Sequence, residues 1–237
     1  QGAPERFLLY RVELVDPAAA PVVDGSLDDA VWRSRATLGP LRNFLGPLAG
    51  DVATQRSDFM LVSDGQWLYI GADLHDDDMA SVRCDPAKDP FWNDCVELYF
   101  DPRHDGTRSI QLVVDCGARR FWQKRSDDGY GWREDTSWHV LSRWEAAARR
   151  SEDRWSLELA IHCASFGIDP SPGRVCGFNA CRFRYHRVTS YAVTCNPGFG
   201  AGAADDTLTL WAAEGVGMVK SQNQANGSTV ELVSFTP

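Results

Sequence analysis

The 237-residue sequence lacks the features that mark several large classes of protein. It holds no G-x-S-x-G motif, no Walker loop and no H-E-x-x-H motif, so nothing in it indicates catalysis. Lys and Arg (24) are outnumbered by Asp and Glu (33), and with a net charge of −9 there is no basic patch of the kind that nucleic acid requires. No apolar run reaches the roughly 18 residues of a membrane span. We therefore expect neither an enzyme, nor a nucleic-acid-binding protein, nor a membrane-spanning one.

The cysteines lack a CxxC pair, which disfavours a zinc site. There are seven of them, so at least one thiol is free or bridges to another chain. Disulfides suit an exported protein, and a chain that begins at Gln1 suits a processed or trimmed N-terminus. We expect a secreted or cell-surface protein whose disulfide pairing the sequence leaves open.

Long amphipathic helices are also missing, and short alternating segments take their place. Residues 57–74 are typical of a hairpin, because Asp64-Gly65 stands between two alternating apolar runs. A short helix is expected over Leu27–Ala36, where Ser26 is an N-cap candidate. Apart from such turns and one short helix, the chain consists of brief strand-like segments.

Many short strands separated by turns favour an all-β fold, an antiparallel β-sandwich of jelly-roll-like form with one or two short helices. Length permits a single domain over residues 1–237. Residues 1–20 are expected to be an N-terminal edge strand or arm, and residues 212–237 a C-terminal strand or extension.

The stretch Asp89–Pro102, DPFWNDCVELYFDP, joins an aromatic pair to an alternating strand. Phe91 and Trp92 come first, and then one face of the strand carries apolar side chains while Glu97 lies on the other. Glu97 is either solvated on an outer face, the more frequent case, or a polar group in a groove. Trp92 either plugs the end of the sandwich or faces a ligand.

His75 is followed by three adjacent carboxylates, Asp76, Asp77 and Asp78. They are either a solvated acidic loop or the oxygen ligands of a structural Ca²⁺ site. The spacing is not that of an EF-hand, so both interpretations stay open.

The order of these segments resembles the family 9 carbohydrate-binding modules. The matching pieces, in the family's order, are residues 23–25 (VDG), 27–32 (LDDAVW), 67–72 (WLYIGA), 89–102, 111–114 (QLVV), 155–161 (WSLELAI) and 177–179 (GFN). The resemblance implies a β-sandwich, commonly with bound calcium, on secreted or cell-surface proteins that handle glycans.

In sugar-binding members of this family two tryptophans clamp a terminal sugar, and a strand carboxylate bonds its hydroxyl groups. By this resemblance Phe91 or Trp92 is the first clamp and Glu97 the carboxylate. Gln111 and Asp115 stand where polar groove residues are expected. Two departures follow: the position of a groove arginine holds Val113, and the region of the second clamp, residues 190–199, has no Trp, so that only Tyr191 or Phe199 could substitute.

Three functional hypotheses result. The first is a non-catalytic module that binds glycan by aromatic stacking and a strand carboxylate. The second is a structural or interaction subunit of an extracellular or cell-surface assembly, with other protein chains as partners through exposed edge strands. The third is a haem-binding relative of the same sandwich, for which Met60, Met79 and Met218 are the only thioether ligands.

Overall fold

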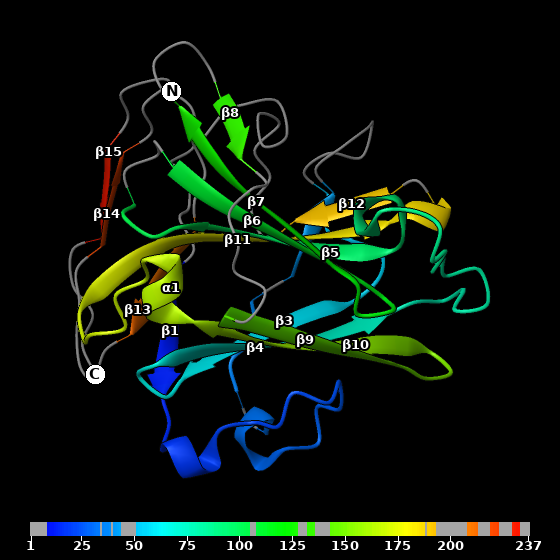
Figure 1. The fold of residues 1–237 in the computed structure, drawn as a ribbon, viewed down its shortest axis with the longest axis horizontal. Helices are drawn as coiled ribbons and strands as arrows, with labels where there is room; N and C mark the ends of the chain where they lie inside the picture. Colours follow the sequence, from blue (N-terminus) through cyan, green and yellow to red (C-terminus); the bar gives the residue numbers. More distant parts are fainter. Residues whose placement is uncertain are drawn as a thin grey trace.

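The chain forms a sandwich of two sheets rich in antiparallel pairs (Figure 1). The structure is a computed structural model and describes residues 9–33, 35–38, 40–43, 51–104, 108–127, 132–135, 143–187, 189–192, 208–212, 219–222 and 229–232. The predicted all-β sandwich is confirmed. Among the residues described, no helix combines the length and the apolar character needed to cross a membrane.

Sheet A, the upper layer in Figure 1, has the strand order β8-β7-β6-β5-β11, and both β12 and β13 also pair with β11. A short strand, β2, pairs with β12. The bounds are β8 (Trp132–Asp135), β7 (Arg120–Asp127), β6 (Arg108–Asp115), β5 (Cys95–Asp101), β11 (Arg174–Arg184), β12 (Thr189–Ala192), β13 (Leu208–Ala212) and β2 (Arg42–Asn43). The strand predicted after Phe91-Trp92 is therefore β5, in the interior of this sheet.

Sheet B, the lower layer, has the order β1-β3-β4-β10-β9. Its bounds are β1 (Leu9–Leu14), β3 (Ser57–Ser63), β4 (Trp67–His75), β10 (Arg154–His162) and β9 (Trp144–Arg150). β1 pairs in parallel with β13 and then with β3, so it connects the two sheets. The N-terminal strand thus lies between two others and not at an edge. Two further strands, β14 (Val219–Gln222) and β15 (Thr229–Leu232), form a separate hairpin in the C-terminal region.

The predicted hairpin is β3–β4, and its turn shows why the prediction holds. Gly65 has φ +88°, a conformation that glycine adopts without strain. The Asp64 carboxylate accepts the backbone N–H groups of Gln66 and Trp67 at 2.8 and 2.7 Å. Both determinants are local, so the sequence alone identifies the turn.

The core lies between the sheets, where the inward side chains of each strand meet. On β5 these are Val96, Leu98 and Phe100, all fully buried. On β10 they include Trp155 and Leu157, which are also fully buried. This alternation leaves the odd-numbered side chains of β5, Glu97 among them, on the outer face of sheet A.

The outer face of sheet B is covered by the N-terminal segment, residues 15–33, shown in blue beneath the lower sheet in Figure 1. This segment contains two 3₁₀ turns, η1 (Pro17–Ala19) and η2 (Ala30–Trp32). The helix predicted over Leu27–Ala36 was therefore too long. Val31 and Trp32 are instead buried against the sheet, and this tertiary packing outweighs helical propensity.

A single helical turn, α1 (Cys163–Phe166), follows β10 and ends at Gly167 with φ +70°. Two more 3₁₀ turns are η3 (Pro90–Trp92) and η5 (Tyr185–Arg187).

The six described cysteines are all free thiols, and five of them are buried. Burial raises the pKa of Cys163 to about 11, so this thiol is a poor nucleophile near neutral pH. The seventh cysteine, Cys195, lies outside the described residues, and the expected disulfide is not seen among the other six.

Candidate functional site

Four aromatic rings gather where β5 begins. Phe91 and Trp92 belong to η3, and Trp92 is 49% exposed while Phe91 is partly buried. The ring of Phe91 meets that of Phe121 edge to face at 5.3 Å between centroids. The ring of Trp92 meets Tyr185, on η5, in the same way at 5.8 Å. We call Phe91, Trp92, Phe121 and Tyr185 the aromatic rim.

A buried polar cluster anchors this rim. Asn93, which follows η3, is fully buried and donates from Nδ2 to the carboxylate of Asp115 at 2.9 Å. Asp115 also accepts the backbone N–H groups of Gly117 and Arg119, at 2.9 Å each, and the Arg119 guanidinium at 2.7 Å. The resemblance placed Asp115 in a groove. In the structure, its carboxylate instead holds the residues next to the aromatic rim in place.

Strand pairing brings four polar side chains together on the outer face of sheet A. Tyr99 of β5 lies opposite Gln111 of β6, which in turn lies opposite Gln123 of β7. Glu97 precedes Tyr99 by two residues and thus lies on the same face. Phe121 of the aromatic rim is two strands from Glu97, a spacing of about 10 Å.

These side chains form a continuous hydrogen-bonded network. Glu97 Oε2 accepts the Tyr99 hydroxyl at 2.5 Å and Gln111 Nε2 at 2.9 Å. Gln111 Oε1 accepts Gln123 Nε2 at 2.6 Å. We call Glu97, Tyr99, Gln111 and Gln123 the Glu97 network. Because each member fixes its neighbour, the carboxylate has a defined orientation.

Glu97 is only 8% exposed, which rules out the first of its two interpretations, a solvated carboxylate on an outer face. Burial raises the pKa of the Glu97 carboxyl above its ordinary value, and the hydrogen bonds from Tyr99 and Gln111 offset only part of that rise. Burial also raises the pKa of Tyr99, and the neighbouring Glu97 charge adds to this. A tyrosine that stays protonated is a steady donor to the carboxylate.

Sequence reasoning placed Glu97 and Gln111 correctly on one surface but did not single out Tyr99, Gln123 or Phe121. Tyr99 carried a usable signal, because alternation puts it on the same face as Glu97. Gln123 and Phe121 carried none, because their positions depend on the register of β7 against β6.

Tyr191, the proposed second clamp, lies on the other face of sheet A. It pairs with Arg182, which in turn pairs with the inward-facing Val96. Tyr191 is buried, and its hydroxyl contacts Thr54 at 3.0 Å and Arg184 at 3.2 Å. Tyr191 and Glu97 therefore do not line one surface. The other candidate, Phe199, lies outside the described residues.

The acidic turn Asp76–Asp78 is paired with arginines. The buried Asp76 carboxylate contacts Arg182 at 2.9 Å and Arg184 at 2.7 Å. Asp77 also contacts Arg184, at 2.9 Å, and Asp78 contacts Arg187 at 2.8 Å. Burial by itself would raise the pKa of Asp76, but the hydrogen bonds from Arg184 and Asp78 and the two guanidinium charges lower it overall.

Asp76, Asp94 and His186 bring ligand atoms within 4.8 Å of one another, the one such group among the residues that the structure describes. His186 Nδ1 already contacts Asp94 at 2.5 Å, however, and both Asp76 oxygens already accept from guanidinium groups. A calcium ion would lie next to two positive charges, which disfavours its binding. These residues therefore do not fit the Ca²⁺ that the resemblance implied.

Comparison with known proteins identifies the family. Residues 23–188, more than half of the chain, match the family described as "Carbohydrate family 9 binding domain-like". No curated protein gives a significant match.

Three solved structures are similar in fold. One is a family 9 carbohydrate-binding module from Caldicellulosiruptor kristjanssonii in complex with cellotriose (16% identity, TM-score 0.64, covering 97% of this chain and 100% of that one). Another, from the same organism, is in complex with glucose (18% identity, TM-score 0.61, covering 88% of this chain and 97% of that one). A proposed carbohydrate-binding protein from Bacteroides uniformis is also similar (16% identity, TM-score 0.65, covering 87% of this chain and 99% of that one). Given the extent of the sequence match, this protein belongs to the carbohydrate family 9 binding domain-like family.

Proposed function

We propose that the chain is a non-catalytic module that binds glycan on the outer face of sheet A, beside the aromatic rim. One observation carries the proposal: the half-exposed Trp92 contacts Phe91, whose ring meets Phe121 on the face of sheet A that bears the oriented Glu97 carboxylate. Sugar-binding sites need this combination, because a pyranose ring has an apolar face and a polar edge.

In this mode the sugar ring stacks on Trp92, with Phe91 as the second ring of the pair. The ring hydroxyls donate to the Glu97 carboxylate, which only accepts, or bond to the Gln111 amide, which both accepts and donates; they take the place of the present partners. The similarity to modules in complex with cellotriose and glucose supports glucose-containing glycans as the first ligands to test.

The face offers poor support for hydrolysis. Glycosidases use two carboxylates on either side of the bond that is cleaved. The acid diagonal to Glu97 in the strand register is Asp115, and Arg119 holds it in an ion pair at 2.7 Å. A carboxylate held in this way is unsuited to exchange protons with a substrate.

We place the module outside the cell or at its surface, because polymeric glycans are met there. The net charge of −9 is compatible with a neutral ligand and gives no attraction to anionic polymers as a whole.

Titration of the native protein with cellotriose and glucose, followed by calorimetry and tryptophan fluorescence, tests the proposal. We expect saturable binding that quenches or enhances the Trp92 signal and is weakened in Trp92→Ala. Glu158→Gln, a buried carboxylate changed on the opposite sheet, is the matched control for Glu97→Gln. If no glycan of a broad array binds, or if binding is the same in Trp92→Ala and Glu97→Gln, the proposal fails.

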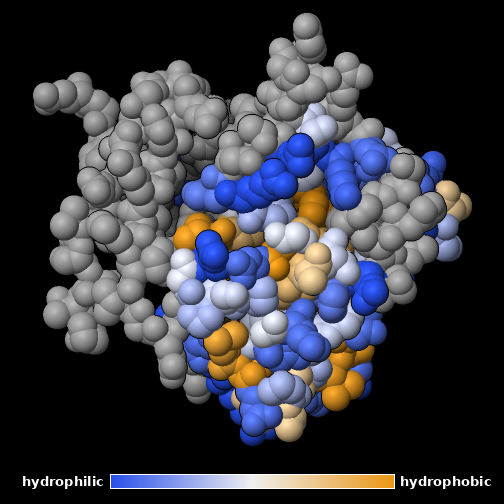
Figure 2. Space-filling view, turned by 60° about the vertical axis from the view of Figure 1, so that its left-hand side comes forward, coloured by the Kyte–Doolittle hydropathy of each residue, from blue (hydrophilic) through white to orange (hydrophobic). Residues whose placement is uncertain are grey.

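The two other hypotheses gain less support. A subunit of an assembly needs a large apolar surface or an open edge strand. On the face drawn in Figure 2 the hydrophobic residues lie in small patches among hydrophilic ones, and β1 is paired along its length, with β13 over residues 9–12 and with β3 over residues 13–14. Of the methionines considered for haem, Met60 packs under the N-terminal segment and Met79 lies in the core, whereas Met218 is outside the described residues.

A further inference from the structure

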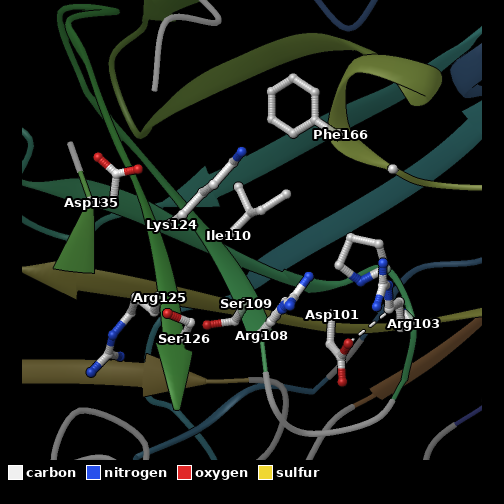
Figure 3. Close-up of a pocket in the computed structure, with 12 residues that line it drawn as sticks. Asp101, Arg103, Arg108, Ser109, Ile110, Lys124, Arg125, Ser126, Asp135 and Phe166 are labelled. Carbon is white, nitrogen blue, oxygen red and sulfur yellow. Dashed lines mark hydrogen bonds between the residues drawn. The ribbon is translucent and has the colours of Figure 1, made fainter. Parts of the chain in front are cut away.

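A cavity of about 380 Å³ opens between the ends of β5, β6 and β7 and the helix α1 (Figure 3). Pockets that hold small ligands have volumes of about 300–1,000 Å³, so this one is large enough for a single sugar unit. It is distinct from the Glu97 network, because its floor is made by inward-facing side chains. Lys124 lies opposite Ile110 in the strand register, and in Figure 3 both extend toward Phe166.

The floor of the cavity is apolar and its rim is basic. Ile110, Phe166 and Pro102 supply the apolar surface. Arg103 and Arg108 lie together at one side of the opening. Both are exposed, and neither guanidinium group makes an ion pair or hydrogen bond with any described residue.

The charge balance of the lining is the reverse of that of the whole chain. The lining holds Arg103, Arg108, Lys124 and Arg125 against two acids, whereas the chain has 33 acidic and 24 basic residues. Arg125 points away from Phe166 in Figure 3. Asp135 lies opposite Lys124 in the register and offsets that charge.

The second acid, Asp101, is buried and accepts the backbone N–H of Arg103 at 3.2 Å. Asp101 thus supplies one negative charge against the two guanidinium groups of Arg103 and Arg108, so a net positive charge remains at the opening.

The geometry points to a second binding site, for a carboxylated sugar unit such as a glucuronate or galacturonate residue. A guanidinium group matches a carboxylate through two parallel hydrogen bonds, which a neutral hexose cannot supply. The C–H face of the sugar packs on Ile110 and Phe166, and the Ser126 hydroxyl, which pairs in register with Arg108, is available to a ring hydroxyl. Only the choice of a sugar as the carrier of the carboxylate rests on the proposed function.

Calorimetric titration of the native protein with glucuronate, with glucose as the neutral counterpart and with sulfate at equal ionic strength, tests this site. We expect glucuronate to bind, with an affinity that falls as salt is added, and the double variant Arg103→Gln/Arg108→Gln to weaken it by about tenfold or more. Arg149→Gln, which removes an exposed charge from β9 in sheet B, is the matched control and should bind glucuronate as the native protein does.

Two further binding measurements distinguish this site from the Glu97 network. Glu97→Gln and Trp92→Ala should leave glucuronate binding unchanged, and the arginine double variant should leave cellotriose binding unchanged. The inference is overturned if glucuronate does not bind, if the arginine double variant binds it as tightly as the native protein, or if sulfate competes as well as glucuronate. Loss of cellotriose binding alone would overturn the proposed function and not this site.

Discussion

Glu97 and Glu158 are both buried carboxylates in the middle of a strand, and they lie on the outer faces of opposite sheets. Glu158 accepts the backbone N–H groups of Asp24 and Gly25, at 3.0 and 2.9 Å, and the Trp32 indole at 2.7 Å. All three donors belong to the N-terminal segment. Glu97 instead accepts from side chains of its own sheet.

The difference shows that what covers a sheet decides what its carboxylate does. The donors to Glu158 are held by the backbone of a segment that packs on sheet B, and a Cβ at Gly25 would come within 2.8 Å of the Ala148 backbone. The contact between Glu158 and the N-terminal segment is therefore structural and leaves no room for a ligand. Tyr99 and Gln111 are side chains, which can rotate and exchange partners. The same residue type therefore serves the fold on one sheet and a candidate site on the other.

The largest expected effect is on stability, in Glu158→Gln. The amide keeps one acceptor but directs an NH₂ group at fixed donors, so we expect the free energy of unfolding to fall by about 2–4 kcal/mol. Urea denaturation measures this. Glycan affinity of the folded protein should not change, and a loss of less than about 1 kcal/mol would contradict the structural role.

Glu97→Gln should instead lower glycan affinity strongly and stability only slightly. Loss of a charge-assisted hydrogen bond to a sugar hydroxyl costs about 1.5–3 kcal/mol, so we expect a ten- to hundredfold loss of affinity. Stability should change by less than about 1 kcal/mol, because Gln still accepts from Tyr99. Calorimetry and urea denaturation on the same preparations give both numbers. Unchanged affinity would remove Glu97 from the site.

Trp92→Ala should have a smaller effect on affinity. Stacking of an aromatic ring contributes about 0.5–1.5 kcal/mol, which corresponds to a loss of about two- to tenfold. Because Trp92 is half-exposed, stability should change by less than about 0.5 kcal/mol. Val22→Ala, at an exposed apolar residue of the N-terminal segment, is the control. A large loss of stability would show instead that Trp92 plugs the sandwich.

The two carboxyls should share one pH dependence. Burial raises the pKa of both Glu97 and Glu158 above the ordinary 4.5, so the folded protein binds these protons more tightly than the unfolded chain does. Their contribution to stability is complete below pH 4.5 and is lost as pH rises through the raised pKa. Urea denaturation across this range should show the decline. Glu158→Gln should flatten it, and an unchanged profile in both Gln variants would contradict the assignment.

Asp76 extends the comparison to a third buried carboxylate, which has Arg182 and Arg184 as partners. Since these arginines supply the positive charge, we expect a chelator to leave the unfolding temperature unchanged. Thermal unfolding with and without EDTA, and again with added calcium, tests this. A lower unfolding temperature in EDTA that calcium restores would contradict the arginine pairing.

Local signals explain which parts of the fold were predictable. The β3–β4 hairpin was found because Asp64 and Gly65 make the turn by themselves, and β5 because its alternation is strict. The helix over Leu27–Ala36 was overestimated because Val31 and Trp32 are buried against sheet B, where Trp32 donates to Glu158, 126 residues away in sequence.

The candidate site was predictable in part for the same reason. Glu97 and Gln111 stand on neighbouring strands and share the outer face, and Phe91, a few residues before Glu97, contacts Phe121 of that face. The face on which Tyr191 lies depends on the pairing of β12 with β11, and the partners of Asp76 depend on arginines 106 and 108 residues away. Nothing near these residues in sequence indicates either outcome.

The sequence by itself determined the strands, their turns and the proximity of an aromatic pair to an acid, because period-two alternation and turn chemistry act over a few residues. Only the tertiary structure decided that Glu97 is buried among amides, that Glu158 is held by the N-terminal segment and that Asp76 is paired with arginines. The physical reason is that strand register, set by contacts between distant segments, decides which side chains share a face and which charges meet away from water.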